Sequence, residues 1–470
     1  MKWDDFPEWG ARVSEWARDY HASVGERPVR ARTVPGEVLA ALPAHPPEAP
    51  ESLEEVFRDF EEIVMPGITH WQHPRFFAYF AANAAPASVL AEFIASALAP
   101  QCMLWQTSPA ATEMETRMMD WLREAIGLPE PFRGVIQDSA SSATLAAVLT
   151  LRERALGWTG NSAGLAGNRQ LRVYASAEAH TSVDRAIWVS GIGAENLVRV
   201  PIAGDWRGMD PEALRAMVEA DLAAGLVPAG LILCVGGTGT GATDPIAACL
   251  DIAEEYGLFT HVDAAWAGSA MICPEYREMW QGVERADSVV FNPHKWLGVQ
   301  FDCSAHFLKD PDDLVRTLAI SPEYLKTHGA DGIVNYSEWS VPLGRRFRAL
   351  KIWFVLRAYG LEALRARLRN HILWAGQLHD QLAEEPDFEI VTAPMWSLFT
   401  FRYRPDGAAD LDALNLALVT AINDDGRIYL TQTRVDGALV IRFQAGQFDT
   451  TEEDVMMAHG VITEIARGLA

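Results

Sequence analysis

Short apolar runs alternate with segments of helical period between residues 132 and 310 of this 470-residue chain. This alternation constrains the fold more than any other feature, because strands separated by helices assemble into a mostly parallel sheet with helices on both faces. The sequence therefore predicts an α/β fold with a seven-stranded sheet. The expected strands lie at 133–137, 171–175, 196–200, 230–235, 258–263, 287–291 and 303–308.

Two smaller parts are expected on either side of this region. Residues 1–40 have the pattern of an amphipathic helix with a stripe of aromatic residues. Such a helix can pack on its own subunit or form an arm on a second subunit, and we favour the arm because an aromatic-rich helix needs a partner surface. Residues 345–385 predict one or two long helices. Four apolar runs predict the strands of a small α+β domain, at 388–392, 398–403, 428–431 and 438–443. We expect an N-terminal helical arm over 1–85, a large domain over 86–350 and a small C-terminal domain over 351–470.

The composition argues against several classes of partner. Lys and Arg number 39 against 63 Asp and Glu, and the resulting net charge of −24 repels phosphate backbones and anionic lipid. We therefore expect neither a nucleic-acid nor a membrane partner. The five cysteines are scattered without a CxxC pair, so we expect no metal site and no disulfide framework. The N-terminus lacks the pattern of a signal peptide, which favours a cytoplasmic location.

Two reactive side chains lie at the ends of predicted strands. Lys295 follows the strand at 287–291, at the sheet edge where α/β proteins bind ligands, and a desolvated lysine is a nucleophile for carbonyl groups. Asp263 ends the strand at 258–263, and a buried carboxylate needs a cationic partner such as a protonated ring nitrogen. Taken alone, a solvated lysine and a capping or core-paired aspartate would be the simpler explanations.

Two further segments complete a set of functional groups. The strand at 133–137 turns through Ser139, Ala140 and Ser141 into an Ala-rich helix, whose N-terminal amides suit a phosphate group. His180 follows the strand at 171–175, where an imidazole could stack on a flat ring. A phosphate site, a stacking imidazole, an acid for a ring nitrogen and an amine for a Schiff base are what pyridoxal 5′-phosphate requires.

The chain also resembles a known family, the pyridoxal-phosphate-dependent group II decarboxylases, specifically the aromatic-L-amino-acid decarboxylases. The resemblance covers nearly the whole chain and implies fold type I, the aspartate-aminotransferase type, with a homodimer whose active site lies at the interface. Six motifs carry it, at 65–71 (MPGITHW), 73–80 (HPRFFAYF), 118–122 (MMDWL), 261–265 (HVDAA), 292–296 (NPHKW) and 342–348 (PLGRRFR).

The resemblance implies a role for each residue of the site. Lys295 would hold the cofactor as an internal aldimine, Asp263 would keep the ring nitrogen protonated, and His180 would stack on the ring. Tyr324, on a loop that covers the active site, would protonate the substrate Cα. The other cofactor-binding residues would be Ser139, Ala140, Ser141, Thr238, Ala265, Asn292 and His294. Asp138 stands where relatives commonly have Gly, and an acid beside the phosphate site is expected to weaken it.

The expected reaction converts an aromatic L-amino acid (tryptophan, phenylalanine, tyrosine or dopa) to the aryl-ethylamine and carbon dioxide. Gly344 matches a position where, in plant relatives, Gly accompanies indole substrates, which favours tryptophan or phenylalanine over dopa. The resemblance implies a substrate pocket formed by Trp71, Tyr79, Phe80, Met103 and Gly344.

Other functions are compatible with the same residues. An aromatic aldehyde synthase would release hydrogen peroxide and ammonia, but Tyr324 together with His180 favours simple decarboxylation, because relatives that form aldehydes tend to carry Phe at position 324. An aminotransferase would depend on a 2-oxo acid. A decarboxylase for a non-aromatic, acidic amino acid would need cationic pocket residues, and a cofactor-free binding protein would not need an intact Lys295.

Overall fold

The computed structural model describes residues 1–320 and 332–469. The chain folds into two compact units, one formed by Met1–Ala81 with Leu373–Ala470 and the other by Ala82–Ile372. We call them the terminal unit and the central unit. The predicted three-domain division, with boundaries at 85 and 350, stays a prediction.

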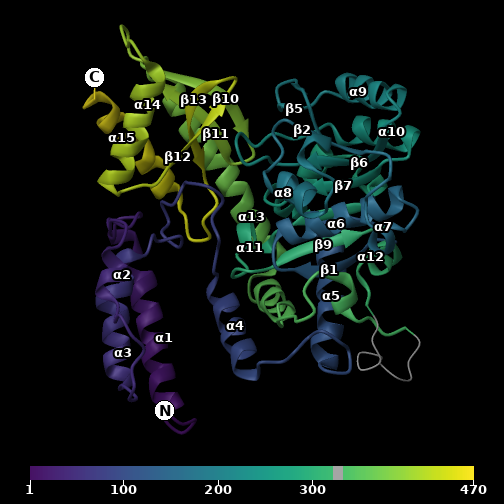
Figure 1. The fold of residues 1–470 in the computed structure, drawn as a ribbon. Coiled ribbons are helices and arrows are strands. Elements are labelled where there is room, and N and C mark those ends of the chain that lie inside the picture. The colour runs from purple at the N-terminus through teal and green to yellow at the C-terminus, as the bar shows by residue number, and fades with distance from the viewer. Residues whose placement is uncertain (321–331, 470) are drawn as a thin grey trace. The chain divides into compact units, whose positions relative to one another are not determined.

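The central unit contains a seven-stranded sheet with the strand order β1-β9-β8-β7-β6-β2-β3 (Figure 1). All seven predicted strands belong to it, and the predicted α/β fold is confirmed. Strands β8, β7, β6, β2 and β3 are mutually parallel, whereas β9 is antiparallel to both β8 and β1. The strands are β1 (Arg133–Gln137), β2 (Leu171–Ser176), β3 (Leu197–Val200), β6 (Val227–Cys234), β7 (Phe259–Asp263), β8 (Ser288–Phe291) and β9 (Ser304–Leu308).

Helices pack against this sheet through apolar side chains. Helix α6 contributes Ala147, Val148 and Leu151 to a buried cluster with Val173 and Ala175 of β2. The α-helices that lie entirely within the described part of the central unit are α4 (Pro86–Leu98), α5 (Pro109–Ile126), α6 (Ala140–Ala155), α7 (Gly160–Ala163), α8 (Ser182–Val189), α9 (Pro211–Ala223), α10 (Ile246–Tyr256), α11 (Pro293–Trp296) and α12 (Pro311–Leu318). A small hairpin, β4 (Ile202–Ala203) and β5 (Gly208–Met209), lies apart from the main sheet.

Local sequence signals explain several helix boundaries. Helices α9 and α12 begin with a proline, which suits the first helical position, and each is capped by a preceding aspartate, Asp210 or Asp310. The long segment predicted at 345–385 is α13 (Ala349–Ala383), which is interrupted at Gly360, where φ is 71°. This left-handed conformation favours glycine, so the glycine at position 360 explains why the helix is interrupted there.

The terminal unit combines N-terminal helices with a four-stranded antiparallel sheet of order β10-β11-β13-β12. Its core includes Phe77, Phe399, Phe401 and Phe443. Its elements are α1 (Phe6–Ser23), α2 (Glu37–Ala41), α3 (Leu53–Asp59), β10 (Phe388–Met395), β11 (Leu398–Tyr403), α14 (Leu411–Asp425), β12 (Thr431–Val435), β13 (Ala438–Gln444) and α15 (Glu452–Arg467).

The aromatic stripe of α1 contacts residues of its own chain. The Trp9 ring lies 6.2 Å from that of Phe57, and the Trp16 ring lies 5.2 Å from that of Phe60. Packing of the arm on a second subunit stays a prediction. Within residues 1–320 and 332–469, no helix is long and apolar enough to cross a membrane.

Candidate active site

The carboxyl ends of four neighbouring parallel strands meet at one edge of the central sheet, because parallel strands share a direction. Asp263 is the last residue of β7. Lys295, Thr238 and His180 follow the ends of β8, β6 and β2. The topology therefore brings four of the sequence-predicted residues to the same edge.

Asp263 is a buried carboxylate, with 8% of its surface exposed. Its Oδ1 accepts a hydrogen bond of 3.0 Å from the backbone N–H of Ala265, which fixes the side chain and leaves Oδ2 for another donor. The backbone N–H of Asn292 donates to the carbonyl of Ala265 at 2.9 Å, so the segment after β7 is tied to the segment after β8. This hydrogen bond fixes the positions of Asp263 and of the turn that carries Lys295 relative to each other.

Lys295 lies in the short helix α11 and is half-buried. Asn83 secures the turn, because its side-chain amide donates to the Lys295 carbonyl and its backbone N–H donates to the His294 carbonyl. Burial lowers the pKa of His294 to about 3. The ring is therefore neutral, and its Nδ1 accepts from the Cys303 N–H at 3.0 Å, which places the ring proton on Nε2.

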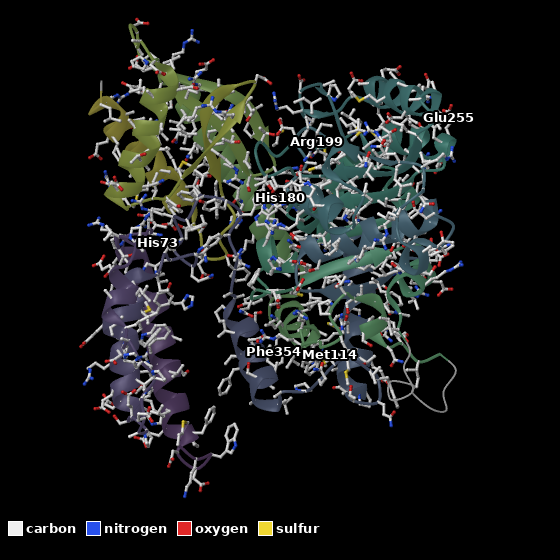
Figure 2. All side chains as sticks on the ribbon, viewed as in Figure 1. His73, Met114, His180, Arg199, Glu255 and Phe354 are labelled. Atoms are coloured by element: carbon white, nitrogen blue, oxygen red, sulfur yellow. The ribbon has the colours of Figure 1, made fainter. Side chains whose placement is uncertain are left out.

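His180, labelled in Figure 2, lies on the connection between β2 and α8. The residue is solvent-exposed, yet desolvation of its ring lowers its pKa. The charge of Asp263 acts to raise this pKa and that of Lys295 acts to lower it, so the three predicted groups interact electrostatically. Nδ1 of His180 accepts from the Ser182 N–H at 3.1 Å, which favours a neutral ring with its proton on Nε2.

The predicted phosphate site is the N-terminus of the 16-residue helix α6. Ser139 caps this helix, because its Oγ accepts from the Ser142 N–H at 3.2 Å. The amides of the first turn, including those of Ala140 and Ser141, face the end of the helix as in other anion sites. Ala140 belongs to an apolar cluster with Val290 of β8, against which Ala265 packs, so the phosphate site lies beside the Asp263 segment.

Asp138 does not turn away from the phosphate site. Its Oδ1 accepts the hydroxyl hydrogen of Ser139 at 3.0 Å. This bond engages the Ser139 hydroxyl, which would otherwise be available to donate to a phosphate oxygen. The Asp138 carboxylate also adds negative charge beside the phosphate site. The structure thus gives a geometric basis for the weakening expected from the sequence.

Two further predicted cofactor residues lie near these ends. Asn292 is buried, and its Oδ1 accepts from the Ser304 hydroxyl at 2.7 Å, which identifies Nδ2 as its donor. Thr238 lies in a tight loop whose Gly236 has φ of 79°. A Cβ at Gly236 would lie 2.5 Å from Cβ of Ala267, so only glycine fits this close approach.

These residues fit pyridoxal phosphate in the chemistry of their donors and acceptors: helix amides for the phosphate, a buried carboxylate for the ring nitrogen, and an amine in a half-buried turn. The fold and the site therefore define a fold type I pyridoxal-phosphate enzyme. The pyridoxal-dependent decarboxylase conserved domain matches residues 35–404. The chain belongs to the pyridoxal-dependent decarboxylase family, and its cofactor is pyridoxal phosphate.

Individual relatives are similar along nearly their whole length. The chain is 39% identical to phenylacetaldehyde synthase of Arabidopsis thaliana, over 99% of this chain and 96% of the relative. It is 40% identical to tyrosine decarboxylase 2 of the same plant, over 97% and 85%. The structure of Oryza sativa TDC with PLP and tryptamine superimposes with a TM-score of 0.96 at 35% identity, covering 100% of this chain and 99% of the other.

The predicted substrate residues Trp71, Tyr79 and Phe80 belong to the terminal unit. The rings of Trp71 and Tyr79 stack at 5.8 Å, and Tyr79 has a left-handed backbone with φ of 47°. The Arg442 guanidinium lies 4.7 Å from the centre of the buried Phe80 ring. Burial lowers the pKa of Arg442 to about 9.

Tyr429 also belongs to this aromatic cluster, although no sequence motif marks it. Its ring lies 6.2 Å from that of Tyr79, and burial, followed by a hydrogen bond with Tyr79, raises its pKa to about 12. No local signal could have found it, because the bridge between Phe76 and Tyr429 joins segments that are about 350 positions apart in the chain.

The other predicted substrate residues, Met103 and Gly344, belong to the central unit. Met103 is half-buried, and its carbonyl accepts from the Ser337 N–H at 3.0 Å. Gly344 lines a cavity of about 450 Å³ that also includes Gln101, a residue that no sequence motif marks. Tyr324 lies outside the described residues.

The basic residues that follow Gly344 form internal ion pairs. Arg345 pairs with Glu115 in the interior, and Arg348 pairs with Asp302 at 2.9 Å. Lys351, which is fully buried, lies 3.2 Å from Glu92. These residues stabilise the segment that carries Gly344.

Proposed function

We propose that this protein decarboxylates aromatic L-amino acids to aryl-ethylamines. The observation that carries the proposal is the arrangement of Asp263, Lys295 and His180 at neighbouring strand ends, where both charges act on the pKa of His180. The names of the relatives support an aromatic substrate, since they include a tyrosine decarboxylase and a structure with bound tryptamine.

Bound pyridoxal phosphate supplies an electron sink for the charge that remains at the substrate Cα when carbon dioxide leaves. The amine of Lys295 would hold the cofactor's aldehyde carbon, and the first-turn amides of α6 would hold its phosphate. Asp263 would keep a proton on the ring nitrogen, because a buried carboxylate favours a cationic neighbour. A neutral His180 would lie against the ring without opposing this positive charge.

Protonation of the substrate Cα completes the reaction. In this proposal the hydroxyl of Tyr324 donates that proton, as the family resemblance implies. The stacked rings of Trp71 and Tyr79, together with Phe80, would contact the aromatic side chain of the substrate. None of these three side chains is cationic, so none would pair with the side-chain carboxylate of an acidic substrate.

A substrate panel tests the proposal. The protein is incubated with pyridoxal phosphate and separately with tryptophan, phenylalanine, tyrosine, dopa, histidine or glutamate, and amines are identified by mass spectrometry. We expect amines from the aromatic amino acids and none from glutamate. Amine from glutamate alone, or none from any aromatic substrate, would contradict the proposal.

An aldehyde synthase is the second candidate, favoured by the 39% identity to phenylacetaldehyde synthase. It differs in its products, because oxidative deamination consumes oxygen and releases hydrogen peroxide and ammonia. We favour the decarboxylase because position 324 is Tyr and position 180 is His. Peroxide formed in proportion to carbon dioxide would establish the synthase instead.

We also propose that the protein is a homodimer with its active sites at the interface. Helix α4 supports this proposal, because Leu90, Phe93 and Leu98 are 58%, 51% and 64% exposed in the single chain. Apolar side chains gathered on one helix are typical of surfaces that another subunit covers. Light scattering at micromolar concentration tests it, and a monomeric mass would contradict it.

A further inference from the structure

The cavity beside Gly344 contains a polar side chain with a fixed orientation. Its wall combines apolar residues of the α4 region, Ala95 and Ala99, with Phe347. The charged residues on this wall are already engaged, because Glu92 pairs with Arg346 and Arg345 pairs with Glu115. Gln101 is neutral, and its amide provides hydrogen-bonding groups at this wall without a net charge.

A backbone hydrogen bond determines which way the Gln101 amide points. The Arg345 N–H donates to Oε1 of Gln101 at 2.7 Å. A backbone N–H can only donate, so the atom it meets must be the amide oxygen. The nitrogen therefore lies on the other side of the amide, toward Gly344: a Cβ added to Gly344 would lie 3.3 Å from Nε2 and 4.0 Å from Oε1.

Gly344 also lines a cavity on the side of the predicted phosphate site. A second cavity of about 120 Å³ shares Gly344 and Arg345 with the first and extends to Asp138. Asp138 is the residue whose carboxylate accepts from Ser139 at the start of α6. The Gln101 amide thus lies in the wall of a cavity that shares Gly344 and Arg345 with the cavity beside Asp138.

We propose that Nε2 of Gln101 donates a hydrogen bond to an oxygen on the aromatic ring of the substrate, and that it selects hydroxylated rings over unsubstituted ones. The inference rests on the proposed function, in which Gly344 belongs to the substrate pocket. A phenolic oxygen can accept a hydrogen bond from Nε2 of this amide, whereas an indole N–H cannot, because it can only donate. Gln101 thus favours tyrosine or dopa, contrary to the preference expected from Gly344 alone.

The matched pair of tyrosine and phenylalanine isolates the hydroxyl group. The measured quantity is the ratio of kcat/KM for tyrosine to that for phenylalanine, in the wild-type protein and in Gln101→Glu. The carboxylate of this variant still accepts from the Arg345 N–H but has no N–H to donate. We expect the ratio to fall about 5-fold, the size of one neutral hydrogen bond at an accessible site.

Two further variants separate the donor from general disturbance of the segment. In Gly344→Ala the new Cβ presses on Nε2, so the ratio should fall in the same direction as in Gln101→Glu. Gln106 is an exposed glutamine on the same segment that does not line the cavity, so Gln106→Leu should leave the ratio unchanged. An unchanged ratio in Gln101→Glu would overturn the inference.

A binding measurement tests the hydrogen bond from Gln101 independently of the proposed decarboxylase activity. If no aromatic amino acid yields an amine, the proposed function fails, and calorimetry with tyramine and phenethylamine then tests Gln101 directly on the protein loaded with pyridoxal phosphate. Tighter binding of tyramine that is lost in Gln101→Glu would support the hydrogen bond. Equal affinities for the two amines in the wild-type protein would overturn it.

Discussion

Asp138 places a negative charge where the cofactor phosphate is expected to bind. Its carboxylate accepts from the Ser139 hydroxyl at 3.0 Å and is half-buried, so solvent screens the charge only in part. We predict that Asp138→Gly raises the affinity for pyridoxal phosphate by about 3- to 10-fold, because both the repulsion and the competing acceptor are removed. Fluorescence titration of the apoprotein with pyridoxal phosphate measures this change.

Asp138→Asn serves as the control for this prediction, because it removes the charge but keeps an acceptor and a side chain of the same shape. If charge and hydrogen bonding both contribute, the affinity of Asp138→Asn for pyridoxal phosphate should lie between those of the wild-type protein and Asp138→Gly. Weaker binding of the cofactor by Asp138→Gly would show that the carboxylate supports the site.

At the scale of single elements, the N-terminus of α6 has both a structural and a binding role. Ser139→Ala removes the side chain that caps the helix, which should cost about 1 kcal/mol of unfolding free energy, and it should also weaken cofactor binding. Asp410 caps α14 in the terminal unit in the same way, with its Oδ1 accepting from the Ala413 N–H at 3.0 Å.

Asp410→Ala is therefore the matched control: it should lower stability by a similar amount without changing cofactor affinity. Urea unfolding and cofactor titration of both variants compare the two effects. Equal cofactor affinity in Ser139→Ala and the wild-type protein would argue against a phosphate site at α6.

The elements also show which structural features the sequence could predict. The central strands were located to within a few residues because each is a short apolar run bounded by turns or helices. The strand predicted at 428–431 instead lies at Thr431–Val435, because Ile428 and Leu430 are core residues that precede the strand. Register is set by the hairpin turn at Asp436 and Gly437, both with positive φ, rather than by hydrophobicity.

The functional residues also fall into two groups, those that a local sequence pattern identifies and those that it does not. The positions of Lys295, Asp263, His180 and Ser139 were predictable because each ends or follows a strand that the local pattern identifies. Gln101 was not, because its significance depends on a hydrogen bond to Arg345, 244 positions later in the chain. Such long-range contacts leave no trace in local spacing.

At the scale of the whole molecule, buried neutral histidines predict acid sensitivity. Burial lowers the pKa of His73 and His261 to about 4 and of His294 and His371 to about 3, from an ordinary value of 6.5. The unfolded chain therefore binds more protons below pH 6.5. Stability is complete above pH 6.5 and falls as the pH is lowered toward 4, by about 2 kcal/mol for each histidine at pH 5.

His371 offers a test, because its Nδ1 accepts from the Trp296 indole N–H at 2.9 Å and a glutamine oxygen could replace that acceptor. We predict that His371→Gln loses less stability between pH 7 and pH 5 than the wild-type protein, measured as the shift of the urea midpoint. His45→Gln, at an exposed position, should keep the wild-type pH dependence. An unchanged shift in His371→Gln would refute this origin of the acid sensitivity.

In the proposed mechanism Lys295 holds pyridoxal phosphate, and the small number of lysines makes this role directly testable. The chain has five lysines: Lys2, Lys295, Lys309, Lys326 and Lys351. Lys351 is the informative competitor, because it is fully buried and burial lowers its pKa to about 8. The measurement is borohydride reduction of the protein loaded with pyridoxal phosphate, followed by peptide mass spectrometry. We expect the cofactor on the peptide that contains Lys295, whereas modification confined to Lys351 or any other lysine would show that Lys295 does not hold it.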